Sequence, residues 1–193
     1  MFAARILSNS VVRTCARGPA GTRALHVTAS LAIKEGDKLP NEELIEGQST
    51  KIKLADLFGK KRGILIGVPG AFTPGCDGKH LPSYVDNFDE LQKKGIEVIA
   101  CIAVNDQFVM TAWANERQTE GKVHMLADPQ AKVTKALKME KDLAPLGGIR
   151  SKRFSMLIEN GKVAKMFVEP DGVGVSCSLS DNMLEELDNR AAA

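Results

Sequence analysis

The feature that most constrains the fold is a pair of apolar runs joined by one helix-forming segment. Residues 63–68 and 96–103 are short, continuous apolar runs, a pattern typical of strands that are buried on both faces of a sheet. The segment between them carries apolar residues at helical spacing over 74–94 and reaches Gly95, a residue type that commonly ends helices. Pro82 inside this helix predicts a kink. A strand, a helix and a strand in this order predict a right-handed βαβ unit with parallel strands.

The rest of the chain continues this pattern. The expected elements are a helix over 106–119 capped by Asn105-Asp106, a strand over 123–127, a helix over 130–138, strands over 154–158 and 162–168, and a last helix capped by Ser178 and Asp181. Asn160-Gly161, between the last two strands, is the strongest short signal for a β-hairpin. Two βαβ units, a hairpin and a terminal helix predict an α/β protein with the thioredoxin-like fold, in which helices flank a mixed central sheet.

Length and composition restrict the possible classes of function. A chain of 193 residues, 44% of them hydrophobic, can form one good core and gives no reason to expect a second one. No apolar run approaches the length of a membrane span, so no membrane partner is expected. The chain has one Trp and one Tyr, and after residue 30 it has 22 basic against 24 acidic residues, which does not favour nucleic acid as a partner.

The first thirty residues differ from the rest in charge. They contain four arginines and no acidic residue, and they are rich in Ser, Thr and Ala, a composition typical of a mitochondrial transit peptide. Residues 23–28 resemble the recognition pattern of matrix processing, with removal near Ala32. We therefore expect a mitochondrial transit peptide over residues 1–32, a thioredoxin-like domain over 33–193 and a location in the mitochondrial matrix. The alternative is a basic tail without a targeting role.

Two further features bear on location. Residues 189–193 lack a peroxisomal address of the Ser-Lys-Leu type. No methionine lies between Met1 and Met110, so the chain offers no shorter alternative start before Met110. Cytosolic or peroxisomal forms are therefore not supported, and mitochondria alone are favoured.

One cysteine stands at the expected start of a helix. Thr73 is a good N-cap, and Pro74 suits the first helical position because its missing N–H needs no partner there. Cys76 then lies in the first turn, where free backbone N–H groups and the helix dipole favour the thiolate, which is the nucleophilic form. The alternative is a small, buried and inert cysteine, as free cysteines often are.

The other cysteines form no metal or disulfide framework. Cys15 lies in the expected transit peptide, and Cys101 and Cys177 are far from Cys76 in the sequence. Cys76 and His80 are four residues apart, but a zinc site needs two more ligands and the sequence has no second cluster. We therefore expect neither a metal nor a cofactor.

A longer pattern around Cys76 permits a family comparison. Pro69, Thr73 and Cys76 stand in the spacing Pro-x-x-x-Thr-x-x-Cys. Further matches are Val104-Asn105-Asp106, Ala127-Asp128-Pro129, Lys152-Arg153-Phe154-Ser155-Met156 and Val168-Glu169-Pro170-Asp171-Gly172. From about residue 33 to 187 the chain resembles the peroxiredoxins, in particular the branch of animal type-five and plant type-two enzymes, with the mitochondrial type-five enzyme as the nearest match. The resemblance implies a thioredoxin-like fold and an atypical two-cysteine thiol peroxidase.

The resemblance also implies roles for individual residues. Cys76 would attack the peroxide and become a sulfenic acid. Arg153 would hold the thiolate and stabilise the departing oxygen, although position alone would make it a surface cation. Thr73 would orient the peroxide and Pro69 would shield it from water. The backbone N–H groups of Cys76 and Gly75 would bind its second oxygen, and Leu146 and Gly147 would line the mouth of the site.

Two cysteines compete for the role of resolving residue. Cys177 lies in a glycine-rich loop and matches the resolving position of the animal enzymes, so the resemblance implies an intramolecular Cys76–Cys177 disulfide. Cys101 lies within an apolar strand, as in plant relatives, and is the alternative.

The resemblance further implies reaction partners. The substrates would be hydrogen peroxide, alkyl hydroperoxides and peroxynitrite, with thioredoxin as reductant and a noncovalent homodimer as the assembly. Two other functions stay open from the residues themselves. One is a cysteine hydrolase in which His80 or His124 activates Cys76, and the other is a redox-sensing interaction protein.

Overall fold

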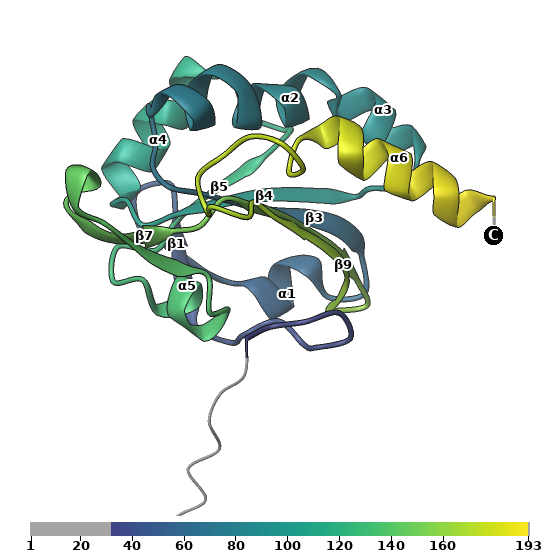
Figure 1. Ribbon diagram of the computed structural model, residues 1–193, viewed down its shortest axis with the longest axis horizontal. Coiled ribbons are helices and arrows are strands. Elements are labelled where there is room, and N and C mark those ends of the chain that lie inside the picture. The colour runs from purple at the N-terminus through teal and green to yellow at the C-terminus, as the bar shows by residue number, and fades with distance from the viewer. Residues whose placement is uncertain (1–31, 193) are drawn as a thin grey trace, which may run out of the picture. The chain divides into compact units, whose positions relative to one another are not determined.

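The computed structural model describes residues 32–192, and its central feature is a seven-stranded mixed sheet (Figure 1). The strand order is β2-β1-β5-β4-β3-β8-β9. These strands are β1 (Glu43–Glu46), β2 (Thr50–Lys53), β3 (Arg62–Val68), β4 (Val98–Ala103), β5 (His124–Ala127), β8 (Phe154–Glu159) and β9 (Lys162–Val168). β3, β4 and β5 pair in parallel, whereas β1, β2, β8 and β9 pair antiparallel to their neighbours. The expected parallel units and mixed sheet are confirmed.

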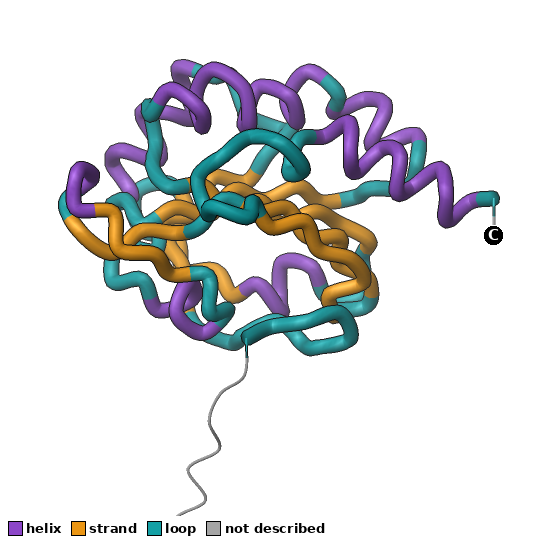
Figure 2. Tube along the Cα trace, viewed as in Figure 1, coloured by secondary structure: helices purple, strands orange, loops and turns teal. Residues whose placement is uncertain are grey.

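Helices cover both faces of this sheet (Figures 1 and 2). They are α1 (Leu54–Phe58), the π-helical segment η1 (Cys76–His80), α2 (Leu81–Asp86), α3 (Phe88–Lys93), α4 (Gln107–Glu116), α5 (Lys132–Ala136) and α6 (Ser180–Ala191). A separate two-stranded sheet of β6 (Glu140–Leu143) and β7 (Gly148–Ser151) encloses the 3₁₀ turn η2 (Ala144–Leu146). Helices α2, α3, α4 and α6 lie on one face of the main sheet, and α1 and α5 lie on the other.

The alternation of side chains along the central strands builds two cores. Ile64 and Ile66 of β3 face the same side as Cys101 of β4, in a core completed by α2, α3, α4 and α6. Leu65 and the neighbouring Ala100 face the opposite core with α1 and α5. Both faces of β3 and β4 are buried, which explains why these strands read as continuous apolar runs.

The hairpin at the sheet edge forms as the sequence predicts. Asn160 has φ of 52° and Gly161 has φ of 69°, and two positive φ values in a two-residue turn match the right-handed twist of the paired strands. Asp106 caps α4 as expected, since its carboxylate accepts the N–H groups of Phe108 and Val109, each at 2.9 Å.

Other elements differ from expectation. The edge hairpin β1–β2 and the β6–β7 hairpin lack an apolar signal because β1 has one buried residue and β2 and β6 have none. Helices α4 and α5 are shorter than the expected 106–119 and 130–138. The last helix starts at Ser180 with no side-chain cap, so the expected capping role of Ser178 is wrong.

The expected single helix over 74–94 is divided into three pieces. The π-helical segment η1 comes first, and the Leu81 N–H donates to the Cys76 carbonyl five residues back. Pro82 follows directly, so this wider turn lies where the proline ring would crowd the carbonyl of Gly78. A second interruption at Asn87 separates α2 from α3. The predicted irregularity is therefore present, but it begins at Cys76 itself.

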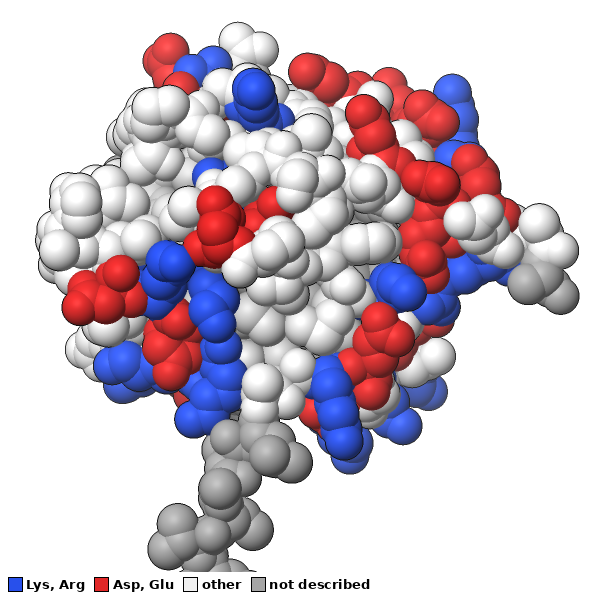
Figure 3. Space-filling view, in the orientation of Figure 1, with Lys and Arg blue, Asp and Glu red and all other residues white. Residues whose placement is uncertain are grey.

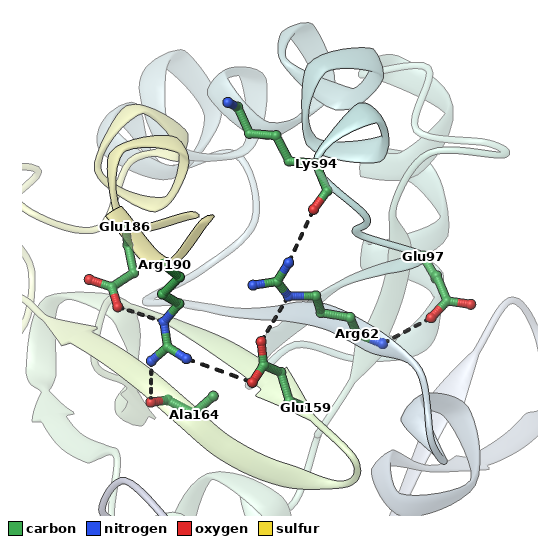
Figure 4. Close-up of polar contacts among 7 residues, drawn as sticks. All are labelled: Arg62, Lys94, Glu97, Glu159, Ala164, Glu186 and Arg190. Carbon is green, nitrogen blue, oxygen red and sulfur yellow. Dashed lines mark hydrogen bonds and ion pairs between the residues drawn. The ribbon is translucent and has the colours of Figure 1, made fainter. Parts of the chain in front are cut away.

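A charged network holds α3 and α6 near the start of β3, at the opposite end of this strand from Cys76 (Figure 4). The Arg62 Nε contacts Glu159 at 2.8 Å, and its Nη1 donates to the Lys94 carbonyl at 3.2 Å. Arg190 of α6 contacts the other Glu159 oxygen at 3.6 Å and Glu186 at 2.7 Å. These groups are partly exposed, so each pair contributes little alone, but together they hold α3 and α6 on the β3–β8–β9 strands.

Among the described residues, no helix is both long and apolar enough to cross a membrane.

The expected transit peptide over residues 1–32, which includes Cys15, lies outside the described residues except for Ala32.

Gly67 permits the close packing of β3 against Phe154. A Cβ built on Gly67 would lie 2.1 Å from the Phe154 ring. We expect Gly67→Ala to lower the free energy of unfolding by about 1–3 kcal/mol or more through overpacking, as measured by urea denaturation. Gly78→Ala is the matched control, because a Cβ there meets nothing within 4 Å. Equal stability of the two variants would contradict the packing role of Gly67.

Candidate active site

Cys76 begins η1, which follows the C-terminal end of β3 after the connecting residues 69–75, and it is fully buried. The Thr73 Oγ1 is 2.8 Å from the Cys76 Sγ and 3.0 Å from the Gly70 carbonyl oxygen. A hydroxyl has one proton, so Thr73 donates to Gly70 when Cys76 is a thiol and can turn to donate to sulfur when Cys76 is a thiolate. Thr73 therefore contacts the sulfur, and the side-chain capping role that the sequence suggested is wrong.

The loop before Cys76 is held in an uncommon conformation. Phe72 has φ of 58°, a left-handed value that is rare for a bulky residue, and its ring lies 6.2 Å from that of Trp113. The Ala71 N–H donates to the Asn105 side chain at 3.0 Å. Pro69 is buried at the start of this loop. Contacts from the segment after β4 thus fix the approach to Cys76.

Arg153 is buried, with 2% of its surface exposed, so it is not the surface cation that its sequence position suggested. Its Nε donates to the Val173 carbonyl at 3.1 Å, and its Nη1 lies 3.3 Å from the His80 Nδ1. Its Nη2 would be 2.8 Å from a Cβ on Gly75. Because Gly75 has no side chain, the Arg153 guanidinium fits against the backbone directly before Cys76.

His80 is a neutral acceptor for Arg153. Its Nε2 lies 3.0 Å from the Ser178 carbonyl, which can only accept, so Nε2 carries the proton and Nδ1 accepts from Arg153. Burial, and then the charge of Arg153, lower the pKa of His80 to about 3. Both ring nitrogens are thus occupied. His124 starts β5, at the opposite end of the parallel strands from Cys76, and contacts Glu46. Neither histidine is placed to activate Cys76 in a hydrolase.

The three described cysteines are all free thiols. Cys101 is fully buried in the same core as Cys76, and burial raises its pKa well above the usual range, as does the nearby Cys76. Cys177 is half-buried in the segment between β9 and α6, residues 169–179, which we call the β9–α6 loop (Figure 2). This loop lies against η1 and α2, since the Ser178 carbonyl accepts from both His80 and Tyr84.

Leu146 and Gly147 lie at the tip of the β6–β7 hairpin. Arg150 links this tip to the site, because its guanidinium donates to the carbonyls of Leu146 and Val104, the latter at 2.8 Å. Among the described residues, no hydrogen bond joins Leu146 or Gly147 to Cys76.

Apolar side chains are exposed near the site. Among the described residues, the large exposed hydrophobic side chains are Phe72, Phe108, Ile149 and Val173, and Phe108 is 66% exposed. Phe72 and Val173 lie in loops, Ile149 lies in β7 and Phe108 lies in α4. Figure 3 shows a largely uncharged surface over α4 and the tip of the β6–β7 hairpin, with charged side chains below it.

Comparison with known proteins identifies the family. The Redoxin family profile matches residues 34–184. Chloroplastic peroxiredoxin-2E of Arabidopsis thaliana is 41% identical over 169 residues, which cover 83% of this chain and 71% of the relative. Chloroplastic peroxiredoxin-2E-2 of Oryza sativa subsp. japonica is 38% identical over 170 residues, which cover 83% and 74%. The chain belongs to the peroxiredoxin family. This peroxiredoxin is an oxidoreductase, a peroxidase, as expected.

Solved peroxiredoxin structures confirm the thioredoxin-like fold. Reduced Prx3 of Vibrio vulnificus in complex with hydrogen peroxide matches with a TM-score of 0.76 and 41% identity, covering 80% of this chain and 99% of that one. Peroxiredoxin 5 of Alvinella pompejana matches with a TM-score of 0.72 and 38% identity, covering 81% and 99%.

The expected mitochondrial location is wrong. The two plant relatives are chloroplastic peroxiredoxins and point to a plastid. The error has a physical origin: mitochondrial and chloroplast transit peptides share an Arg-rich, Ser-rich and acid-poor composition, so the charge pattern of residues 1–30 does not separate them.

Three residues have roles at the site that the sequence did not predict. His80, considered only as a metal ligand or a hydrolase base, accepts from Arg153, and Asn105, expected only to cap a helix, holds the Cys76 loop. Glu169, for which no role was expected, accepts hydrogen bonds from the β9–α6 loop. Asn105 and Glu169 stand in motifs that match the family, which was the one signal that could have indicated them.

The buried neutral His80 predicts a pH dependence of stability. Its pKa falls from 6.5 to about 3 on folding, so the unfolded chain binds a proton that the folded one excludes. This contribution to stability is complete above pH 6.5 and is lost as the pH falls toward 3. We expect His80→Gln, which keeps a donor for Ser178, to reduce the dependence of unfolding free energy on pH by up to about 1.4 kcal/mol per pH unit. Urea denaturation between about pH 7 and pH 5 measures it, above the range in which carboxylates titrate. Identical slopes for parent and variant would contradict a neutral His80.

Proposed function

We propose that this peroxiredoxin reduces peroxides through Cys76 by the atypical two-cysteine mechanism of the type-five enzymes. The observation that carries the proposal is the contact of Cys76 with Thr73 at 2.8 Å beside the buried Arg153. The family supports peroxide substrates and a thioredoxin-type reductant. Prx3 of Vibrio vulnificus, which is similar over most of this chain, was solved with hydrogen peroxide.

In the first step the Cys76 thiolate attacks the terminal peroxide oxygen. A sulfur–oxygen bond forms, the oxygen–oxygen bond breaks, and the departing alkoxide or hydroxide takes up a proton, which leaves Cys76 as a sulfenic acid. Two nitrogens of Arg153 are engaged by Val173 and His80, so Nη2, which lies against Gly75, is the one that faces the developing charge.

The remaining residues shape the peroxide site in this proposal. Thr73 donates a hydrogen bond to sulfur or to peroxide, and the N–H groups of Gly75 and Cys76 bind the second oxygen. Buried Pro69 excludes water. Leu146 and Gly147 line the mouth of the site, where their apolar surroundings suit an alkyl hydroperoxide as well as hydrogen peroxide and peroxynitrite.

Cys177 is the proposed resolving residue. It lies half-buried in a loop with glycines at 172 and 174, so it can move without breaking a sheet. Cys101, the alternative, lies within β4 between β3 and β5, so its backbone cannot move without disturbing a central strand. Thioredoxin would then reduce the Cys76–Cys177 disulfide.

The proposed assembly is a noncovalent homodimer. The exposed apolar side chains of Phe72, Phe108 and Ile149 near the site suit such an interface.

The proposed peroxidase domain is residues 33–193, and residues 1–32 are a targeting segment that is removed from it. The intact mass of the mature protein tests this boundary.

Arg153→Lys should lower the rate of peroxide reduction by on the order of 10²–10³ although the charge is kept. The planar fork can contact Val173, His80 and the reacting atoms together, whereas an ammonium group cannot. Stopped-flow kinetics with hydrogen peroxide measure the rate, and Lys152→Arg, at the preceding position, is the charge-preserving control. A rate within a few-fold of the parent would remove Arg153 from catalysis.

Cys177→Ser should consume one equivalent of peroxide but fail to turn over with thioredoxin, because the Cys76 sulfenic acid then lacks its thiol partner. Mass spectrometry of the oxidised parent should show a Cys76–Cys177 peptide, and Cys76→Ser, which keeps the side-chain volume, should consume no peroxide. A Cys76–Cys101 peptide, or full turnover of Cys177→Ser, would transfer the resolving role to Cys101 or to an external thiol.

A further inference from the structure

One carboxylate holds the part of the β9–α6 loop that contains Cys177. Glu169, with 2% of its surface exposed, accepts five hydrogen bonds from three consecutive residues. Its Oε1 accepts the N–H groups of Ser176, Cys177 and Ser178 at 2.8, 2.9 and 3.0 Å and the Ser178 hydroxyl at 2.7 Å. Its Oε2 accepts the Ser176 hydroxyl at 2.6 Å. The backbone around Cys177 is therefore fixed by a side chain from the end of β9.

The same loop is held from the helix side. The Ser178 carbonyl accepts from the Tyr84 hydroxyl at 2.9 Å and from His80 at 3.0 Å. Since Cys76 and Cys177 are free thiols, their sulfurs must approach to about 2.0 Å before a disulfide can form. If the loop supplies that movement, the hydrogen bonds of Glu169 to Cys177 and its neighbours must open.

The charge of Glu169 acts on the thiol that it anchors. Burial alone would raise the pKa of this carboxyl, but the hydrogen bonds from Ser176, Cys177 and Ser178 outweigh burial and lower it to about 2, so Glu169 is ionised. Burial, and then the charge of Glu169, raise the pKa of Cys177. The anchored loop therefore holds Cys177 in its less nucleophilic thiol form.

We propose that Glu169 is a positioning residue for disulfide formation, which anchors Cys177 and sets the rate at which the β9–α6 loop delivers it to Cys76. This inference rests on the proposed role of Cys177 as resolving residue. When the loop opens, Cys177 loses its proton to solvent and its sulfur attacks the sulfur of the Cys76 sulfenic acid. The sulfur–sulfur bond forms, the sulfur–oxygen bond breaks, and hydroxide leaves and is protonated to water. The oxidant is the peroxide already consumed at Cys76.

The anchoring can be tested without any peroxidase chemistry. In full-length Cys76→Ser protein, the rate of alkylation of Cys177 by iodoacetamide is followed by mass spectrometry of the Cys177 peptide. Because Glu169→Ala removes all five hydrogen bonds, we expect it to accelerate labelling by more than about tenfold. Glu169→Gln keeps an oxygen at the position that accepts four of the five bonds, and we expect it to label at a rate closer to that of the parent.

Asp171→Asn is the matched control within the same loop. The Asp171 carboxylate accepts the N–H groups of Val173 and Gly174 at 2.9 and 2.6 Å, and it makes no hydrogen bond to Cys177 among the described residues. Its labelling rate should equal that of the parent. If Glu169→Ala fails to fold, the double variant Ser176→Ala/Ser178→Ala removes two donors and leaves Glu169 in place, and severalfold faster labelling is expected.

A parent-like labelling rate in Glu169→Ala, or an equal acceleration in Asp171→Asn, overturns the role of Glu169. A second measurement with Cys76 intact follows disulfide formation after one equivalent of peroxide, which should be faster in Glu169→Ala than in Glu169→Gln. If labelling is accelerated but no variant forms a Cys76–Cys177 disulfide, the assignment of Cys177 as resolving residue fails instead. The two failures are therefore distinguishable.

Discussion

The burial of a permanently charged guanidinium against Gly75, the residue before Cys76, is the constraint on which the rest of the site depends. A buried cation is costly unless its donors are satisfied, and Arg153 is 2% exposed. The Val173 carbonyl and the neutral His80 ring satisfy two of its nitrogens, and Gly75 leaves space for the third. One side chain from the start of β8 therefore ties the helix that carries Cys76 to the β9–α6 loop.

This arrangement links the two cysteines through shared partners. His80 can accept a hydrogen bond from Arg153 only while its proton is on Nε2, and the Nε2–H donates to the carbonyl of Ser178, the neighbour of Cys177. Glu169 anchors the same Ser178, and its own N–H donates to the Arg153 carbonyl at 3.1 Å. A loop movement that carries Cys177 toward Cys76 therefore also removes partners from the groups that hold Arg153.

Much of the fold follows from the pattern of the sequence, and the exceptions have physical reasons. β3 and β4 are long apolar runs because both of their faces are buried, and Asn160-Gly161 fixes the β8–β9 turn through two positive φ values. β1, β2 and β6 bury one residue or none, so no periodic signal marks them. The break of the 74–94 helix was indicated by Pro82, but its π-helical form at Cys76 depends on how the helix packs.

By itself the sequence determined the α/β class, the parallel centre of the sheet and the nucleophile candidate, because these rest on local signals: apolar periodicity, turn residues and a cysteine at a helix start. Composition could not determine the organelle, since different transit peptides share it. Only the tertiary structure decided that Arg153 is buried, that His80 is its neutral acceptor and that Glu169 anchors Cys177. The contact of Arg153 with His80 joins residues 73 positions apart on separate elements, and that of Glu169 with Cys177 closes one irregular loop. The chemistry of both depends on burial, which no local pattern specifies.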